Sequence, residues 1–194
     1  MCGRYYIEID DQELEEIVRE AEKKARAYPG QITMKATGEI FPTDIAAVQT
    51  GPGQYQPMQW GFTGFGGKPV INARSESAHE KPMFQASMLQ RRCLIPASGY
   101  YEWQKDAGAG KKTKYAFSVP GSVLYFAGCY RQESGSILPR FVILTRQAAG
   151  EASAIHDRMP LILADRHIED WLSGSLSLHG EAVTDLALRQ LPPA

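Results

Sequence analysis

The sequence opens with the stretch Met1-Cys2-Gly3-Arg4-Tyr5. Side chains alternate in character from Cys2 to Ile9, and this alternation predicts a first β-strand. Free cysteine is among the most buried residue types, so one interpretation of Cys2 is a small apolar residue that opens this strand. The other interpretation is chemical and depends on the residue that precedes it.

Methionine aminopeptidases remove an initiator methionine that a small residue such as Cys2 follows, and we expect Met1 to be removed. The product carries an α-amine and a thiol on adjacent carbons, a pair that no internal cysteine has. The amine, with a pKa of about 8 against about 10.4 for lysine, is partly unprotonated at neutral pH and attacks carbonyls. The thiol can then close on the resulting imine to form a five-membered thiazolidine.

The composition is that of an ordinary soluble domain. The chain has 194 residues, 43% hydrophobic and 22% charged, which fits a single domain over residues 1–194. Apolar runs such as residues 141–144 are far shorter than a membrane span and no targeting segment is visible, so we expect a cytoplasmic monomer without a membrane partner. Three cysteines without paired spacing indicate neither a disulfide framework nor a zinc site, and we expect no metal or other cofactor.

Charge is distributed unevenly along the chain. The net charge is −1, but residues 8–22 hold eight acidic residues and one basic residue. The remainder holds 14 acidic and 20 basic residues, a net charge of +6. Because the acidic cluster falls on one predicted helix, the rest of the molecule can present a basic face to a polyanion.

Hydrophobic periodicity and turn residues predict many short strands and a few helices. The helices are one that Asp10 or Asp11 caps and that ends at about Ala27, and others over residues 83–90, 165–172 and 181–191. The later strands are predicted over residues 39–41, 45–48, 56–61, 69–73, 93–95, 100–104, 115–119, 124–130 and 140–145. Residues 62–68 are expected to form a loop, 96–99 a turn and 106–112 a hairpin tip. Since strands and helices do not alternate regularly, we expect an α+β fold: a mixed or antiparallel β-sheet core, curled toward a barrel, with peripheral helices.

Two polar or aromatic stretches precede residue 80. Trp60-Gly61-Phe62 places two large aromatic residues beside the Gly-rich loop, either as core residues at a strand end or as a stacking or wedge surface for bases. Asn72-Ala73-Arg74-Ser75-Glu76 offers an amide, a guanidinium and a carboxylate. Each of these is compatible with a turn, but together they suit anion capture with hydrogen bonding.

Two further stretches carry candidate acid–base residues. Glu102, within Ser98–Trp103, is either an outward-facing strand residue, which this stretch alone favours, or a buried acid whose pKa is raised by desolvation. His156, within Ile155–Pro160, stands beside a charged pair, although a single histidine is more often structural than catalytic. The HExxH, P-loop, GxSxG and GxGxxG motifs are absent, which argues against several common enzyme classes.

Six motifs in this order resemble those of the SOS response-associated peptidase (SRAP) family. They are Cys2–Arg4, Trp60–Phe62, Asn72–Glu76, Arg92–Ala97, Gly99–Trp103 and Ile155–Pro160. The resemblance runs from residue 2 to about residue 172. In that family the initiator methionine is removed, and the cysteine captures abasic sites in single-stranded DNA as a thiazolidine DNA–protein crosslink, which shields the lesion from strand cleavage. The resemblance therefore implies an α+β fold with a basic groove and a role in DNA repair in the SOS response. It also implies nucleoid association when DNA is bound, and lyase-like and self-processing thiol-peptidase activity.

The resemblance also implies catalytic roles for four residues. Cys2 would supply both nucleophiles, and Asn72 would hold the terminal cysteine or the lesion sugar by hydrogen bonds. Glu102 would be the general acid/base in sugar ring opening and crosslink reversal. His156 would shuttle protons or stabilise the opened sugar hydroxyl.

By the same resemblance, three arginines would clamp the phosphates that bracket the lesion: Arg4, Arg74 and Arg158. Trp60 and Phe62 would wedge or stack near it, which favours single strands because a duplex base must first be unstacked. The family usually continues the Trp-Gly-aromatic motif with a proline and a second tryptophan, where this chain has residues 63–67. The stretch before His156 also departs from the usual Thr-Thr-x-Ala-Asn pattern, and Arg146 there offers another phosphate contact.

Two other function classes remain open at the level of sequence. Class II glutamine amidotransferases also begin with cysteine, but their Asn-Gly-Asp type segment and large synthase domain are not found here. A noncatalytic single-stranded DNA-binding module would keep the arginines and aromatics and be indifferent to Cys2→Ala. A covalent protein–DNA product would persist after denaturation, whereas noncovalent binding would not. Phosphate binding would weaken strongly as the salt concentration rises, whereas glutaminase activity would show little salt dependence.

Overall fold

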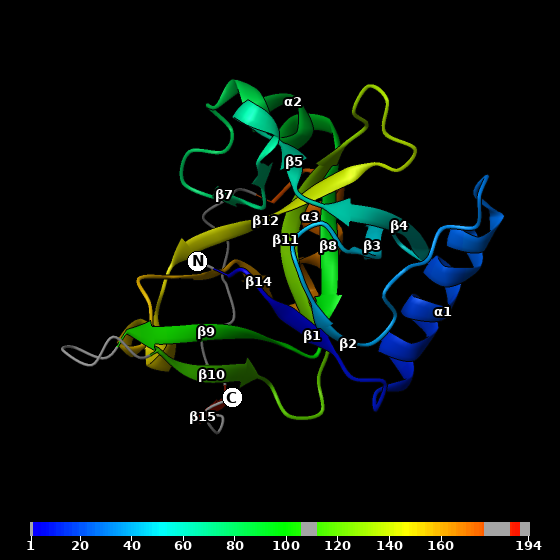
Figure 1. The fold of residues 1–194 in the computed structure, drawn as a ribbon. Helices are drawn as coiled ribbons and strands as arrows, with labels where there is room; N and C mark the ends of the chain where they lie inside the picture. The colour runs from blue at the N-terminus through cyan, green and yellow to red at the C-terminus, as the bar shows by residue number, and fades with distance from the viewer. Residues whose placement is uncertain (1, 106–111, 177–186, 191–194) are drawn as a thin grey trace.

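The computed structural model describes residues 2–105, 112–176 and 187–190, and within them β-strands are the main regular structure (Figure 1). Two sheets dominate. The first contains five strands in the order β15-β10-β9-β1-β2, all antiparallel. Its strands are β1 (Tyr5–Ile7), β2 (Gly38–Ile40), β9 (Gly99–Lys105), β10 (Lys112–Ser118) and β15 (Ala187–Gln190).

The second sheet curls into a closed ring. Its path β12-β4-β3-β8-β11 returns to β12 through a further β11–β12 pairing, while β7, β13 and β14 add to the edges. Its strands are β3 (Ile45–Gly51), β4 (Gln54–Trp60), β7 (Asn72–Arg74), β8 (Arg92–Ala97), β11 (Leu124–Arg131), β12 (Arg140–Gln147), β13 (Arg158–Pro160) and β14 (Ile162–Leu163). β12 runs parallel to β4 and β7 and antiparallel to β11 and β13. The expected α+β fold with a curled, mixed core is therefore confirmed.

The helices lie outside this core (Figure 1). Helix α1 (Gln12–Ala27) begins after Asp11, whose side chain accepts from the backbone N–H groups of Glu13 and Leu14, and its apolar stripe is buried on β3 and β4. α2 (Pro82–Gln90) packs on β11 and β8, and α3 (Ile168–Ser173) packs on β8 and β3. In the described part of the chain, no helix is long and apolar enough to cross a membrane.

The structure differs from the sequence prediction at several positions. The helix expected over residues 181–191 is wrong at residues 187–190, which form β15 on the edge of β10, because an open strand edge outweighs weak helical periodicity; residues 181–186 and 191 lie outside the described ranges. Residues 62–68, expected to form a loop, begin with β5 (Phe62–Thr63), which pairs with β6 (Pro69–Val70) around a 3-10 turn at Phe65–Gly67. The tip predicted at 106–112 lies outside the described residues except for Lys112, which begins β10.

The turn expected at residues 96–99 is instead a corner between the two sheets. β8 continues through Ala97 and β9 begins at Gly99, so Ser98 alone separates a strand of the closed second sheet from a strand of the first sheet. A Cβ atom at Gly99 would collide with the Phe117 carbonyl and the Tyr6 ring, and the corner therefore requires glycine. This corner brings β9 alongside β1.

Candidate active site and nucleic-acid interface

Cys2 is held through both its side chain and its carbonyl. It is fully buried, as the first interpretation of this residue expected. Its Sγ donates to the Arg4 carbonyl at 3.8 Å, and Asn72 Nδ2 donates to the Cys2 carbonyl at 2.8 Å. Asn72 begins β7, which is fixed by parallel pairing with β12. The amide and the cysteine of two separate motifs thus meet.

Glu102 lies on the inner face of β9, not on the outer face that its own stretch favoured. Tyr5 and Tyr100 are directly paired and fully buried, and Glu102, two residues farther on, faces the same side because side chains alternate along a strand. Its exposed fraction is only 4%. Burial raises the pKa of the Cys2 thiol, and the negative charge of Glu102 raises it further, so carboxylate and thiol are electrostatic neighbours.

A pocket of about 620 Å³ opens beside these residues. Its lining is formed by Gly3, Arg4, Glu102, Trp103, Gln104, Lys112, Ala154, Ile155, His156 and Asp157. Three of the residues singled out from sequence therefore share one pocket: Arg4 directly before β1, Glu102 from β9 and His156 from the loop before β13. Gly3, the neighbour of Cys2, forms part of the same wall.

The His156 ring is oriented through its Nδ1 atom. This nitrogen accepts the backbone N–H of Arg158 at 3.0 Å and lies 2.6 Å from Asp157 Oδ1. The backbone N–H of His156 donates to Ala152 in the preceding 3-10 turn (Gly150–Ala154). These contacts present a half-buried imidazole to the pocket.

Three of the arginines expected to contact DNA lie on neighbouring strands, with Arg146 on the opposite face of the sheet from Arg74 and Arg158. β7 and β13 flank β12, with Arg74 paired to Thr145 and Arg158 paired to Gln147, and Arg146 stands between these two positions of β12. Arg74 is exposed and Arg146 is half-buried.

Arg158 already has an anionic partner. It forms a bidentate ion pair with Glu76 at 2.7 and 2.9 Å and donates to the Thr145 carbonyl at 2.6 Å. Hydrogen bonds from Arg158 lower the pKa of Glu76 to about 2. A DNA phosphate at Arg158 would therefore have to replace or share this carboxylate.

Comparison with known proteins identifies the family. The family model described as "SOS response associated peptidase (SRAP)" matches residues 1–192. The chain belongs to the SRAP family. It is 39% identical to the abasic site processing protein YoaM of Bacillus subtilis over 111 residues, which cover 55% of this chain and 48% of YoaM. It is 31% identical to the abasic site processing protein YedK of Escherichia coli over 142 residues, which cover 71% of this chain and 63% of YedK.

The chain spans about half the length of the first Bacillus relatives that it matches. The fold of this SRAP-family chain also resembles the crystal structure of a protein from Bacteroides thetaiotaomicron. The TM-score is 0.76 at 21% identity, and the match covers 98% of this chain and 92% of that one.

One predicted part of the SRAP site is not at the surface. Trp60 and Phe62 are both fully buried: Trp60 packs against Tyr5 and Phe141, and Phe62 packs against Phe84. The interpretation of these rings as a stacking or wedge surface is wrong for this structure, because a base needs an exposed ring face. The alternative of core residues at a strand end is the correct one.

Sequence reasoning also missed three residues at the pocket. Trp103 and Lys112 line it, and Lys114, two positions beyond Lys112 on β10, lies beside them. The alternating lysines of Lys112-Thr113-Lys114 were the available signal, since they place two cations on one side of a strand. Among the described residues, no cluster of His, Cys, Asp and Glu is arranged to hold a metal ion.

Proposed function

We propose that this chain recognises abasic sites in single-stranded DNA and captures them as a thiazolidine crosslink through Cys2 after Met1 is removed. The observation that carries the proposal is the position of Cys2, held by the Asn72 amide and next to the Glu102 carboxylate at a pocket that also contains His156. The names of the relatives, abasic site processing proteins, support the same substrate. Family membership supports a role in the DNA-damage response.

Capture of the sugar aldehyde by Cys2 is a condensation that releases one water. While Met1 is attached, the nitrogen of Cys2 is an amide, so hydrolysis of the Met1–Cys2 bond must come first. The free amine then adds to the aldehyde carbon of the opened sugar, and loss of one water gives an imine. The thiol adds to the imine carbon, a C–S bond forms, and the thiol proton is transferred to the nitrogen. The product has the mass of protein plus DNA minus one water.

Glu102 and His156 are suited to the proton transfers. Because burial raises the pKa of the Cys2 thiol, the thiol is protonated at neutral pH and needs a base as the C–S bond forms. Glu102 is the neighbouring carboxylate, and in reversal it would return the proton. His156 would act on the hydroxyl released when the sugar ring opens. General acid–base help of this kind contributes about 10²–10⁴ in rate.

Arg4 in the pocket wall and the exposed Arg74 on β7 would bind the phosphates on either side of the lesion. A flexible single strand can bring both phosphates to Arg4 and Arg74 without the cost of unpairing a duplex. We further propose that the protein acts as a cytoplasmic monomer that joins the nucleoid when bound to DNA, and that its peptidase activity is limited to self-processing.

Intact-mass spectrometry tests the proposal. Demethionylated protein is mixed with a single-stranded oligonucleotide that carries one abasic site. We expect an adduct at the summed masses minus one water, absent in Cys2→Ala and in protein that keeps Met1. Glu102→Ala and His156→Ala should slow its formation or reversal.

A protein that bound the oligonucleotide without any denaturant-resistant adduct would contradict covalent capture. That result would instead favour the noncatalytic single-stranded DNA-binding module.

A further inference from the structure

Glu39 lies between two cations at the edge of the pocket. Its Oε2 is 2.9 Å from Arg4 Nη1, and its Oε1 is 2.6 Å from Lys114 Nζ. Both distances fall in the range of charge-assisted hydrogen bonds. Burial disfavours the charged carboxylate, but Lys114 and Arg4 outweigh this and lower the pKa of Glu39. The two cations and one carboxylate leave a local charge of about +1.

Aromatic rings hold both cations in place. The Lys114 ammonium lies 3.8 Å from the centre of the Tyr101 ring. The Arg4 guanidinium lies 4.3 Å from the centre of the Phe41 ring and 4.9 Å from that of Trp103. Such contacts favour a cation over the ring face and restrict its movement. The two positive groups would therefore keep their positions if the carboxylate left.

The pair of cations is continuous with the pocket. Arg4 and Trp103 belong to its lining, and Lys114 is paired to Trp103 across β9 and β10. Glu39 comes from the edge strand β2, with 32% of its side chain exposed, so its carboxylate can turn toward solvent.

We propose that Glu39 occupies, in the free protein, the site where Arg4 and Lys114 bind the DNA phosphate next to the captured nucleotide. A carboxylate and a phosphate each present two anionic oxygens, so one can replace the other between the same two donors. The inference rests on the proposed function for the identity of the DNA. Its consequence is selectivity: an undamaged strand must displace Glu39 without the gain of covalent capture, so it binds weakly and leaves.

Binding of undamaged single-stranded DNA tests this exchange separately from crosslinking. The protein is the full chain with Cys2→Ala, and the probe is a fluorescein-labelled oligothymidylate without a lesion, followed by anisotropy at several salt concentrations. We expect Glu39→Gln to bind the oligothymidylate about 3–10-fold more tightly at low salt. The slope of the logarithm of the association constant against the logarithm of the salt concentration should become steeper by about 0.7, because one phosphate no longer competes with Glu39 for the two cations.

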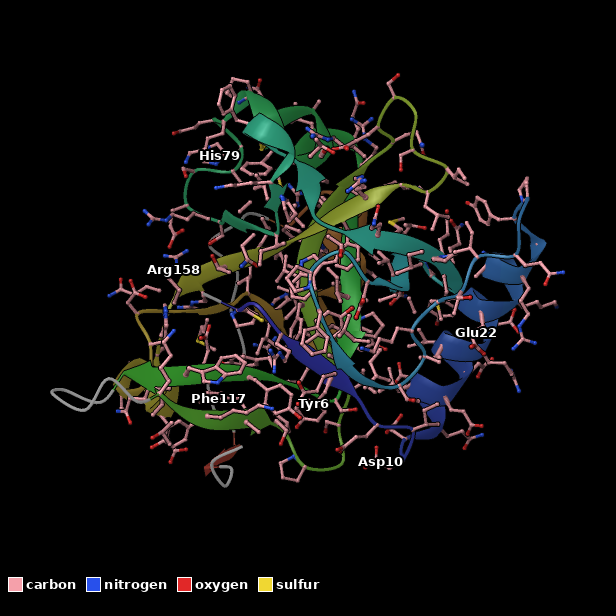
Figure 2. The ribbon with its side chains drawn as sticks, viewed as in Figure 1. Tyr6, Asp10, Glu22, His79, Phe117 and Arg158 are labelled. Carbon is pink, nitrogen blue, oxygen red and sulfur yellow. The ribbon has the colours of Figure 1, made fainter. Side chains whose placement is uncertain are left out.

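Two further variants complete the comparison. Glu22→Gln changes the net charge equally, but Glu22 lies on α1, across the molecule from Arg158 (Figure 2), and should change affinity less than about twofold because distant charges are screened by salt. Lys114→Gln should weaken binding and reduce the salt slope by about 0.7. It supplies the test if Glu39→Gln does not fold.

Weaker binding by Glu39→Gln would overturn the proposal and make Glu39 a residue that positions the cations. The proposal would also be overturned if Glu39→Gln changed DNA affinity no more than Glu22→Gln does, or if Lys114→Gln left DNA affinity unchanged. If the wild-type protein gave no covalent adduct by mass spectrometry but Glu39→Gln still bound undamaged DNA more tightly, only the covalent function would be contradicted.

Discussion

Replacing Trp60 by phenylalanine separates a core role from a DNA-stacking role. The indole is fully buried between Tyr5 and Phe141, with ring centres at 5.2 and 6.3 Å. Its Nε1 donates to the Ile71 carbonyl at 3.0 Å, directly before Asn72, the residue that holds Cys2. Phenylalanine keeps an aromatic ring but removes this donor and part of the buried surface.

The expected loss of stability follows from these contacts. The Ile71 carbonyl also accepts from the Ile143 N–H, so it keeps one partner and the lost hydrogen bond costs about 0.5–1.5 kcal/mol. The smaller ring removes apolar contact worth roughly 2 kcal/mol. A total of about 2–4 kcal/mol lowers the melting temperature by about 4–16 °C for a domain of this size.

Thermal melting and oligonucleotide anisotropy, the latter well below the melting temperature, test the prediction together. We expect Trp60→Phe to lose stability but to keep a DNA affinity within about twofold of wild type. A change in the core does not couple to a distant binding surface when the two sites share no contacts. Trp171→Phe is the matched control, because Trp171 is also fully buried and donates to the Cys93 carbonyl at 2.9 Å. Unchanged melting with clearly weaker binding for Trp60→Phe alone would refute the reasoning and restore the stacking interpretation.

Two other predictions concern titration. Burial raises the pKa of the Cys2 and Cys93 thiols and that of Cys129 to about 12, so a disulfide reagent at pH 8 should modify the native protein slowly but all three cysteines after denaturation; fast reaction at Cys2 in the native protein would contradict its burial. The pKa of Glu76 is lowered to about 2 by Arg158, so the pair stabilises the fold fully above the usual carboxyl pKa and loses this effect as pH falls toward 2. Melting of Glu76→Gln should therefore differ from wild type at pH 6 and converge near pH 2, with a modest difference because half of the Glu76 side chain is exposed.

The sequence was most informative where a signal is local. The apolar stripe of α1 and the cap at Asp11 follow from spacing along one segment, and both are found. The order of the motifs similarly points to Arg4, Glu102 and His156, which share one pocket.

Alternation along a strand shows that two faces exist but not which one meets the core. For that reason the sequence favours an outward-facing Glu102 and allows a surface role for Trp60, whereas both residues are buried. Glu39 and Lys114 are 75 positions apart and meet only because β2, β1, β9 and β10 are neighbours in one sheet. No local pattern contains that order.

The pairing of β1 with β9 has a consequence for the newly made chain. Tyr5 pairs with Tyr100, so the amino-terminal strand leaves the ribosome long before its partner exists. At about 5–20 residues per second, the interval is roughly 5–20 s. Throughout it, Cys2 lacks Glu102 and His156, which are translated later still. On the proposed function, a nascent terminus therefore reacts with stray cellular aldehydes without assistance from these two residues, and assisted capture begins only once β9 and the loop before β13 have been synthesised and folded.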